Sequence, residues 1–172
     1  LGRREALALL GGMGVALAIP STRGHAQERP VCIARPRQTE GPYFVDTGLA
    51  RSDIRPDPVT GVVEAGVPLN LTLRVSRLDA AGCRPWRDAQ VELWQCNARG
   101  VYSGVSDPGF DARGRKFLRG YQPTDAGGVA RFTTIYPGWY PGRTVHLHFM
   151  IRTARPGVGR DEFTSQLYFD DL

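Results

Sequence analysis

The residues best able to do chemistry are concentrated near the C-terminal end of the chain. They are Tyr140, Arg143, His146 and His148. Apolar and polar residues alternate from Val145 to Arg152, which is the period-two pattern of a half-buried strand. Residues two apart on a strand share a face, so His146 and His148 should project side by side and be able to bind one metal ion.

The tyrosine upstream of the histidine pair indicates which metal this would be. A phenol titrates at about pH 10 in water, so it becomes a ligand only when a strong Lewis acid such as Fe(III) removes its proton. Zinc more often recruits Cys, His, Asp or Glu. No carboxylate lies between Tyr140 and His148 to complete an obvious ferrous site of two histidines and one carboxylate. We therefore expect a ferric ion; the alternative is that the two histidines only decorate a polar sheet face.

Two further residues extend this candidate site. Arg143 cannot lose its charge, so beside a metal it would hold an anionic substrate or stabilise charge that develops during a reaction. Tyr102 follows a turn at Asn97–Gly100, at a strand end, where functional side chains often lie. Tyr102 is therefore a candidate fourth ligand, although its position alone leaves this open. Tyr43 lies far upstream in the segment 38–44, where Gly-Pro flanked by aromatic residues predicts an ordered turn.

The rest of the chain is predicted to be an all-β domain with long loops. Its 13 prolines and 21 glycines fall between short alternating runs, as in folds with many turns. No helix is expected after residue 26, and roughly seven or more short strands indicate a β-sandwich. Strands or extended segments are expected at 68–79, 89–96, 101–103, 117–124, 129–136, 145–152 and 163–169. The polar, glycine-rich residues 107–116 are expected to form a long loop near the site.

Residues 1–26 have a different character and are expected to be an export signal. Arg3 and Arg4 precede an apolar run from Ala6 to Ile19, and small residues lead to an expected cleavage site after Ala26. This layout is typical of a bacterial export signal, and the paired arginines are of the twin-arginine type. We therefore predict a mature domain over residues 27–172 that is periplasmic or extracellular. An N-terminal membrane anchor or an amphipathic helix remains the alternative.

The net charge, the hydrophobic pattern and the cysteine content limit what this protein can bind and which disulfides it can form. Removing residues 1–26 lowers the net charge from +5 to +3, which is too mild and too scattered to favour nucleic acid. No later window is long and apolar enough to span a membrane. Of Cys32, Cys83 and Cys96, one pair can be bridged in an exported protein, and the sequence does not say which pair.

Four segments, taken in order, resemble the intradiol ring-cleavage dioxygenases, the family of catechol and protocatechuate dioxygenases. They are TEGPYF at 39–44, VELWQCNARGVYSG at 91–104, LRGYQPTDAGGVARFTTIYPGWYPGRTVHLHF at 118–149 and SQLYF at 165–169. The resemblance implies a transthyretin-like β-sandwich, a mononuclear non-haem Fe(III) cofactor, and a small aromatic diol and O2 as substrates. It also leaves a homo-oligomer open, because family members commonly associate.

The resemblance also assigns roles to individual residues. Tyr102, Tyr140, His146 and His148 match the family's metal ligands, and Tyr140 matches the tyrosinate that substrate displaces. Arg143 matches an active-site arginine, and Gln166 and Tyr43 match residues that line the substrate pocket. The expected reaction is cleavage of a catechol ring between its two hydroxyl-bearing carbons, giving a muconate-type diacid, with Tyr140 as base and Arg143 stabilising negative charge.

Two other interpretations remain open at this point. The domain can be an exported, non-catalytic β-sandwich that binds a metal or an aromatic compound, since a fold alone does not define a function. It can also be a copper or zinc enzyme that uses only the two histidines. For a dioxygenase, the substrate remains open among catechol, protocatechuate, hydroxyquinol and larger diols.

Overall fold

The computed structural model describes residues 32, 35–80, 82–153 and 162–169. The expected export signal, residues 1–26, lies outside this part of the chain. Within it there are ten strands and no helix. The strands are β1 (Pro68–Arg74), β2 (Ser76–Asp79), β3 (Gly82–Pro85), β4 (Ala89–Trp94), β5 (Ser106–Asp107), β6 (Phe110–Asp111), β7 (Arg119–Pro123), β8 (Val129–Ile135), β9 (His146–Thr153) and β10 (Glu162–Tyr168).

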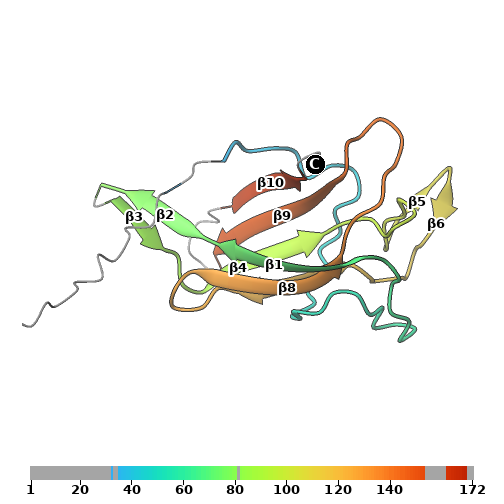
Figure 1. Ribbon diagram of the computed structural model, residues 1–172, viewed down its shortest axis with the longest axis horizontal. Coiled ribbons are helices and arrows are strands. Elements are labelled where there is room, and N and C mark those ends of the chain that lie inside the picture. Colours follow the sequence, from blue (N-terminus) through green and yellow to red (C-terminus); the bar gives the residue numbers. More distant parts are fainter. Residues whose placement is uncertain (1–31, 33–34, 81, 154–161, 170–172) are drawn as a thin grey trace, which may run out of the picture.

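These strands pair as antiparallel ladders. One sheet has four strands in the order β10-β9-β4-β7, and a second has β1 paired with β8. The two short hairpins, β2–β3 and β5–β6, lie at opposite ends of the molecule (Figure 1). The all-β prediction is confirmed.

The main hydrophobic core is formed by inward-facing side chains of both sheets. On the four-stranded sheet, alternate residues of β4 and β9 are buried, and on the other sheet β8 and the partly buried leucines of β1 contribute. The members from these strands are Ala89, Val91, Leu93, Leu147, Phe149, Ile151, Ala130, Phe132, Ile135, Leu69, Leu71 and Leu73. Each large side chain buried in this way stabilises the fold by about 1.5–3 kcal/mol, so the core is what holds the two sheets together.

One irregular segment joins the edges of the two sheets. Ala50 forms a parallel bridge with Tyr121 of β7, and three residues later Asp53 forms a parallel bridge with Thr133 of β8. This segment therefore covers one edge of each sheet, which protects backbone groups that would otherwise be unpaired.

The structure corrects several details of the sequence-based prediction. The strand that carries the histidines was expected to be half-buried, but residues 146–150 are buried on both faces, because a second side-chain cluster covers the polar face. Residues 101–103 do not form a strand. The expected loop 107–116 carries part of the β5–β6 hairpin.

A disulfide joins Cys32 to Cys83 of β3, which leaves Cys96 free and buried. This resolves the pairing that the sequence left open. Burial raises the pKa of the Cys96 thiol to about 11, so the thiol stays protonated at neutral pH. The bridge tethers the start of the described chain to the β2–β3 hairpin.

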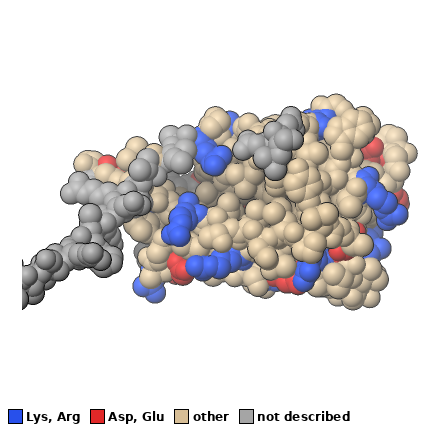
Figure 2. Space-filling view, in the orientation of Figure 1, with Lys and Arg blue, Asp and Glu red and all other residues tan. Residues whose placement is uncertain are grey.

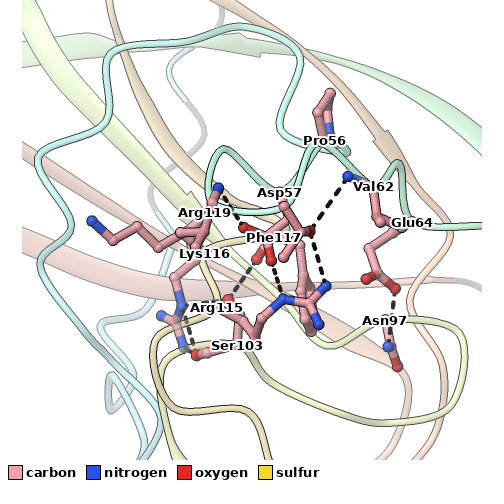
Figure 3. Close-up of polar contacts among 12 residues, drawn as sticks. Pro56, Asp57, Val62, Glu64, Asn97, Ser103, Arg115, Lys116, Phe117 and Arg119 are labelled. Carbon is pink, nitrogen blue, oxygen red and sulfur yellow. Dashed lines mark hydrogen bonds and ion pairs between the residues drawn. The ribbon is translucent and has the colours of Figure 1, made fainter.

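A buried carboxylate fixes the irregular region before β1 (Figure 3). The Asp57 side chain is fully buried and is paired with Arg115, and its Oδ1 accepts a hydrogen bond from the backbone N–H of Val59 at 2.9 Å. Burial alone would raise the pKa of Asp57, but the bonds from Arg115 and Val59 outweigh it and lower that pKa below its ordinary 3.8. This ion pair therefore anchors the loop to the segment before β7.

The surface offers no concentrated basic stripe on the face that Figure 2 shows, where Lys and Arg side chains are scattered and interspersed with Asp and Glu. Among the residues that the structure describes, no helix is long and apolar enough to cross a membrane.

We predict that Arg115→Gln lowers the free energy of unfolding by about 2 kcal/mol, because it leaves the Asp57 carboxylate buried without its cation. The matched control is Arg113→Gln, whose partner Asp111 is exposed and which should change stability by less than about 0.5 kcal/mol. Urea unfolding at neutral pH measures both. The lowered pKa of Asp57 means that its contribution is present above pH 3.8 and is lost as the pH falls further, so the gap between wild type and Arg115→Gln should narrow in acid. Equal losses for the two variants would contradict the anchoring role of Asp57.

Candidate functional site

The candidate site lies on the second face of the four-stranded sheet, opposite the main core. The register pairs His148 with Trp94 of β4 on one side and with Gln166 of β10 on the other. Directly paired residues project from the same face of a sheet. Three strands therefore place an indole, an imidazole and an amide in one row, and His146 follows two residues along the central strand.

The two histidines point their Nε2 atoms at each other, 3.1 Å apart. His146 donates its Nδ1–H to the carbonyl oxygen of Thr144 at 2.6 Å, which leaves the lone pair on Nε2 directed into the site. The His148 ring stacks on Trp94 with centroids 5.0 Å apart and planes 9° apart. Both imidazoles are nearly inaccessible, at 1% and 2% exposure. The predicted side-by-side arrangement of the pair is confirmed.

Both predicted tyrosines reach the same place. The Tyr140 hydroxyl lies 3.2 Å from His146 Nε2, and the Tyr102 ring lies 5.8 Å from the Tyr140 ring and 6.3 Å from the His148 ring. Tyr102 is fully buried and its hydroxyl has no partner that meets hydrogen-bond geometry. Tyr140 is only half-buried, at the rim. Residues from three separate segments therefore converge on one point.

Burial determines the protonation of this cluster in the absence of a bound cation. It lowers the pKa of His148 to about 3 and also lowers the pKa of His146, so both imidazoles are neutral near pH 7 and can act as electron-pair donors. Burial likewise raises the pKa of Tyr102 and the pKa of Tyr140. Both phenols therefore keep their protons unless a strong Lewis acid displaces them.

The cluster contains more buried polar atoms than it can satisfy internally. His148 Nδ1 and the Tyr102 hydroxyl are buried without hydrogen-bond partners. Each such atom costs about 1–3 kcal/mol, and a cation among the donors would relieve the hydroxyl. Among the described residues, no group of three or more His, Cys, Asp and Glu could hold a metal ion. The donors that could reach a metal at this point are the imidazole nitrogens of the two histidines and the phenol oxygens of the two tyrosines, and ionised phenols suit a strong Lewis acid such as Fe(III).

Residues 36–44, which we call the strap, close the site from above. Gln38 donates its N–H to the carbonyl of Thr164 at 3.0 Å, and Gln166 donates Nε2–H to the carbonyl of Thr39 at 3.0 Å. Gly41 has a φ of +74°, and a Cβ there would lie 3.3 Å from Cε1 of His148. The strap therefore packs its backbone onto the imidazole where a larger residue would be too close.

Tyr43, at the end of the strap, completes the aromatic wall. Its ring stacks on Tyr102 with centroids 4.7 Å apart and stands edge-on to Tyr140 at 6.0 Å. The predicted pocket residue Tyr43 is thus beside both phenols. Its hydroxyl donates to Asp107 at 2.7 Å.

Arg143 and Gln166 meet at β10. The Arg143 guanidinium donates to Oε1 of Gln166, which also accepts from the Tyr168 hydroxyl at 2.9 Å. Gln166 therefore holds Arg143 through its oxygen and the strap through its nitrogen. Both predicted residues lie at the site.

Arg119 was not expected at the site, yet it holds two parts of it together. Its guanidinium is 1% exposed and donates to the carbonyl of Tyr43 at 2.7 Å and to the carbonyl of Ser103 at 2.6 Å. Ser103, which follows Tyr102, donates its hydroxyl to the carbonyl of Phe117 at 2.6 Å (Figure 3). Burial lowers the pKa of Arg119 to about 10, so it remains charged at neutral pH. It therefore fixes the backbones that carry the stacked pair Tyr43 and Tyr102.

Sequence reasoning missed Trp94, Arg119 and Asp107 as neighbours of the site. The strand register that sets Trp94 against His148 is not visible in a single sequence. The one signal for Arg119 was its place at the start of an extended segment. That signal is weak, because a charged residue at such a position is usually exposed to solvent. Asp107 carried none beyond its expected place in a loop.

The fold and the cluster together define an all-β protein with a buried two-histidine, two-tyrosine donor set. A family model described as Dioxygenase matches residues 39–171. The chain is 36% identical over 128 residues to the protocatechuate 3,4-dioxygenase beta chain of Burkholderia cepacia, covering 66% of this chain and 51% of that protein. It is 34% identical over 112 residues to catechol 1,2-dioxygenase of Acinetobacter baylyi, covering 62% of this chain and 32% of that protein.

A solved structure agrees with these matches. An intradiol ring-cleavage dioxygenase from Tetranychus urticae aligns with a TM-score of 0.67 and 35% identity, covering 81% of this chain and 66% of that one. The chain belongs to the intradiol ring-cleavage dioxygenase family. It spans about half the length of the protocatechuate relative and about a third of the catechol relative.

The strap contact generates a testable prediction. Gly41→Ala and Gly48→Ala both place a side chain at a positive φ, but only Gly41 has a neighbour within 4 Å, the His148 ring. We expect Gly48→Ala to lower the free energy of unfolding by about 1 kcal/mol from backbone strain. Gly41→Ala should cost at least about 1 kcal/mol more, because the strap or the imidazole must move. Urea unfolding of both variants tests this, and equal costs would contradict close packing of the strap on His148.

Proposed function

We propose that this chain is the catalytic domain of an intradiol ring-cleaving dioxygenase. Tyr102, Tyr140, His146 and His148 would bind one ferric ion, and the substrate would be a catechol-type aromatic diol. The observation that carries the proposal is the convergence of four nitrogen and oxygen donors in a buried cluster that leaves the Tyr102 hydroxyl unpartnered. Membership of the dioxygenase family supports the reaction class.

The reaction would break the bond between the two hydroxyl-bearing carbons and attach one atom of O2 to each of them. Catechol and O2 then give a muconate-type diacid with no other reactant, so atoms and electrons balance. When bound, a ferric ion would favour the ionised phenols and catechol and would make the ring electron-poor enough to react with O2.

The two tyrosines differ in a way that suits different roles. Tyr102 is fully buried beneath Tyr43, so it is a fixed ligand. Tyr140 is half-buried and follows a loop at the rim, so its ring has room to move aside. As it leaves, its phenolate oxygen would accept a proton from a substrate hydroxyl, which makes Tyr140 both ligand and base.

Arg143 would act on the substrate from the β10 side of the site. Its guanidinium is held by the Gln166 amide and keeps its charge at any working pH. A fixed cation at this position would stabilise negative charge as it develops on the ring. The aromatic wall of Tyr43 and Tyr102 excludes water and offers a surface on which an aromatic ring can stack.

Tyrosine substitutions test the metal assignment. The purified protein should contain iron and show a visible tyrosinate-to-iron charge-transfer band that shifts when catechol is added without oxygen. Tyr102→Phe and Tyr140→Phe should each weaken that band, and Tyr140→Phe should lower catechol cleavage by about 100-fold or more, the usual contribution of a general base. Tyr136→Phe, at an exposed position, is the control and should behave as wild type.

Two outcomes would overturn the proposal. Iron-free protein that stays colourless after ferric loading would favour a non-catalytic binding domain. Metal content that is unchanged in both Tyr102→Phe and Tyr140→Phe would favour a copper or zinc site built from the histidines alone.

We also propose that the mature domain is exported. The Cys32–Cys83 disulfide supports this, because such bridges persist in oxidising compartments. The protein recovered from the periplasm or medium of a host with twin-arginine export should begin at Gln27 by intact mass. When the exported protein is denatured without reductant, one reactive thiol, that of Cys96, should be detected. After reduction, three thiols should be detected. Retention of residues 1–26, or three thiols before reduction, would contradict the proposal.

A further inference from the structure

The β5–β6 hairpin brings a carboxylate to the candidate site. The Tyr43 hydroxyl donates to Asp107 Oδ2 at 2.7 Å, and the same Tyr43 ring contacts Tyr102 and Tyr140. Phe110, on the other strand of the hairpin, lies 6.3 Å from the Tyr43 ring. Asp107 is therefore separated from the two proposed ligands by a single phenol ring.

The charge of Asp107 is not neutralised locally. It is half-buried, and its hydrogen bonds come from the Tyr43 hydroxyl and, at 3.4 Å, from the backbone N–H of Gly109. Among the side chains that the structure describes, no Lys or Arg forms an ion pair with it. A partly desolvated charge without a counter-ion acts strongly on its surroundings, so Asp107 places negative charge beside the Tyr43 hydroxyl.

Two arginines lie near the site. Arg143 is bonded to Gln166 on the β10 side, and Arg119 is buried, where it donates to the backbone carbonyls of Tyr43 and Ser103. Arg143 is thus held at β10, whereas the Asp107 carboxylate is the charged group bonded to the Tyr43 hydroxyl. A ring substituent that points toward Tyr43 meets the carboxylate.

The Tyr43 hydroxyl is also restricted in what it can bind. Its proton is committed to Asp107, so toward a substrate it can only accept a hydrogen bond. A substrate hydroxyl would find an acceptor here, whereas a substrate carboxylate would find oxygen lone pairs and a like charge.

We propose that the Asp107–Tyr43 pair sets substrate specificity: it favours catechols whose ring is unsubstituted or carries a further hydroxyl, and it rejects catechols that carry a carboxylate. This inference rests on the proposed function. The charge of the ring substituent would then decide which of the family's substrate types this protein accepts.

The test is a comparison of kcat/KM for catechol, 1,2,4-trihydroxybenzene and 3,4-dihydroxybenzoate. Wild type should use 3,4-dihydroxybenzoate at least tenfold less well than the two uncharged diols. Asp107→Asn, which keeps the shape but removes the charge, should reduce that discrimination at least fivefold. Asp111→Asn on the same hairpin, where Asp111 is exposed and paired with Arg113, is the matched control and should keep the wild-type ratio.

A second variant and a binding measurement separate the possible failures. Tyr43→Phe removes the phenol but leaves the Asp107 charge, so it should still reject the carboxylate. Anaerobic titration of the iron-loaded protein with catechol and with 3,4-dihydroxybenzoate should give the same order of affinity as kcat/KM. If no diol is cleaved or shifts the visible band, the proposed function is wrong. If diols are cleaved but 3,4-dihydroxybenzoate is preferred, or Asp107→Asn leaves the ratio unchanged, the specificity inference alone is overturned.

Discussion

The structure depends on the burial of polar side chains on a sheet face that would ordinarily meet water. His146 and His148 are at most 2% exposed, and the Tyr102 hydroxyl beside them is buried without a partner. Unpaired buried polar atoms are unfavourable, so this arrangement persists only because the surrounding contacts impose it. The rigid four-stranded sheet fixes the imidazoles. Burial of the main core on its opposite face stabilises the fold and offsets the cost of burying these polar atoms.

The wall around these donors is built from loops that are held by a few polar contacts. The strap is bonded to β10 through Gln38 and Gln166. Arg119 ties the strap at Tyr43 to the loop at Ser103. A rigid scaffold with loops positioned over it is a common way to build a site, and here each loop is fixed at its backbone. Side chains such as Tyr140 thus keep freedom at the rim.

Much of the fold and the centre of the site could be predicted from local patterns, and the rest depends on pairing that is invisible locally. Alternation placed the strands and put His146 beside His148, because side-chain direction on a strand follows from sequence position. The row from Trp94 through His148 to Gln166 needs the register of three strands, which alternation does not contain. The resemblance to a known family, not the pattern, pointed to Tyr43. Burial of both faces of the histidine strand could not be predicted, since the covering strap lies about a hundred residues earlier in the sequence.

The Cys32–Cys83 bridge gives the strap a second attachment that differs in kind from the first. Toward the β10 end the strap is held by hydrogen bonds, which open and close on their own, whereas at the Cys32 end it is covalently bound to the β2–β3 hairpin. Where thiols are kept reduced, the segment ahead of the strap loses its tether and only the hydrogen bonds keep the cover on the imidazoles. The disulfide therefore limits how far the chain at the start of the strap can move from the β2–β3 hairpin when those hydrogen bonds open.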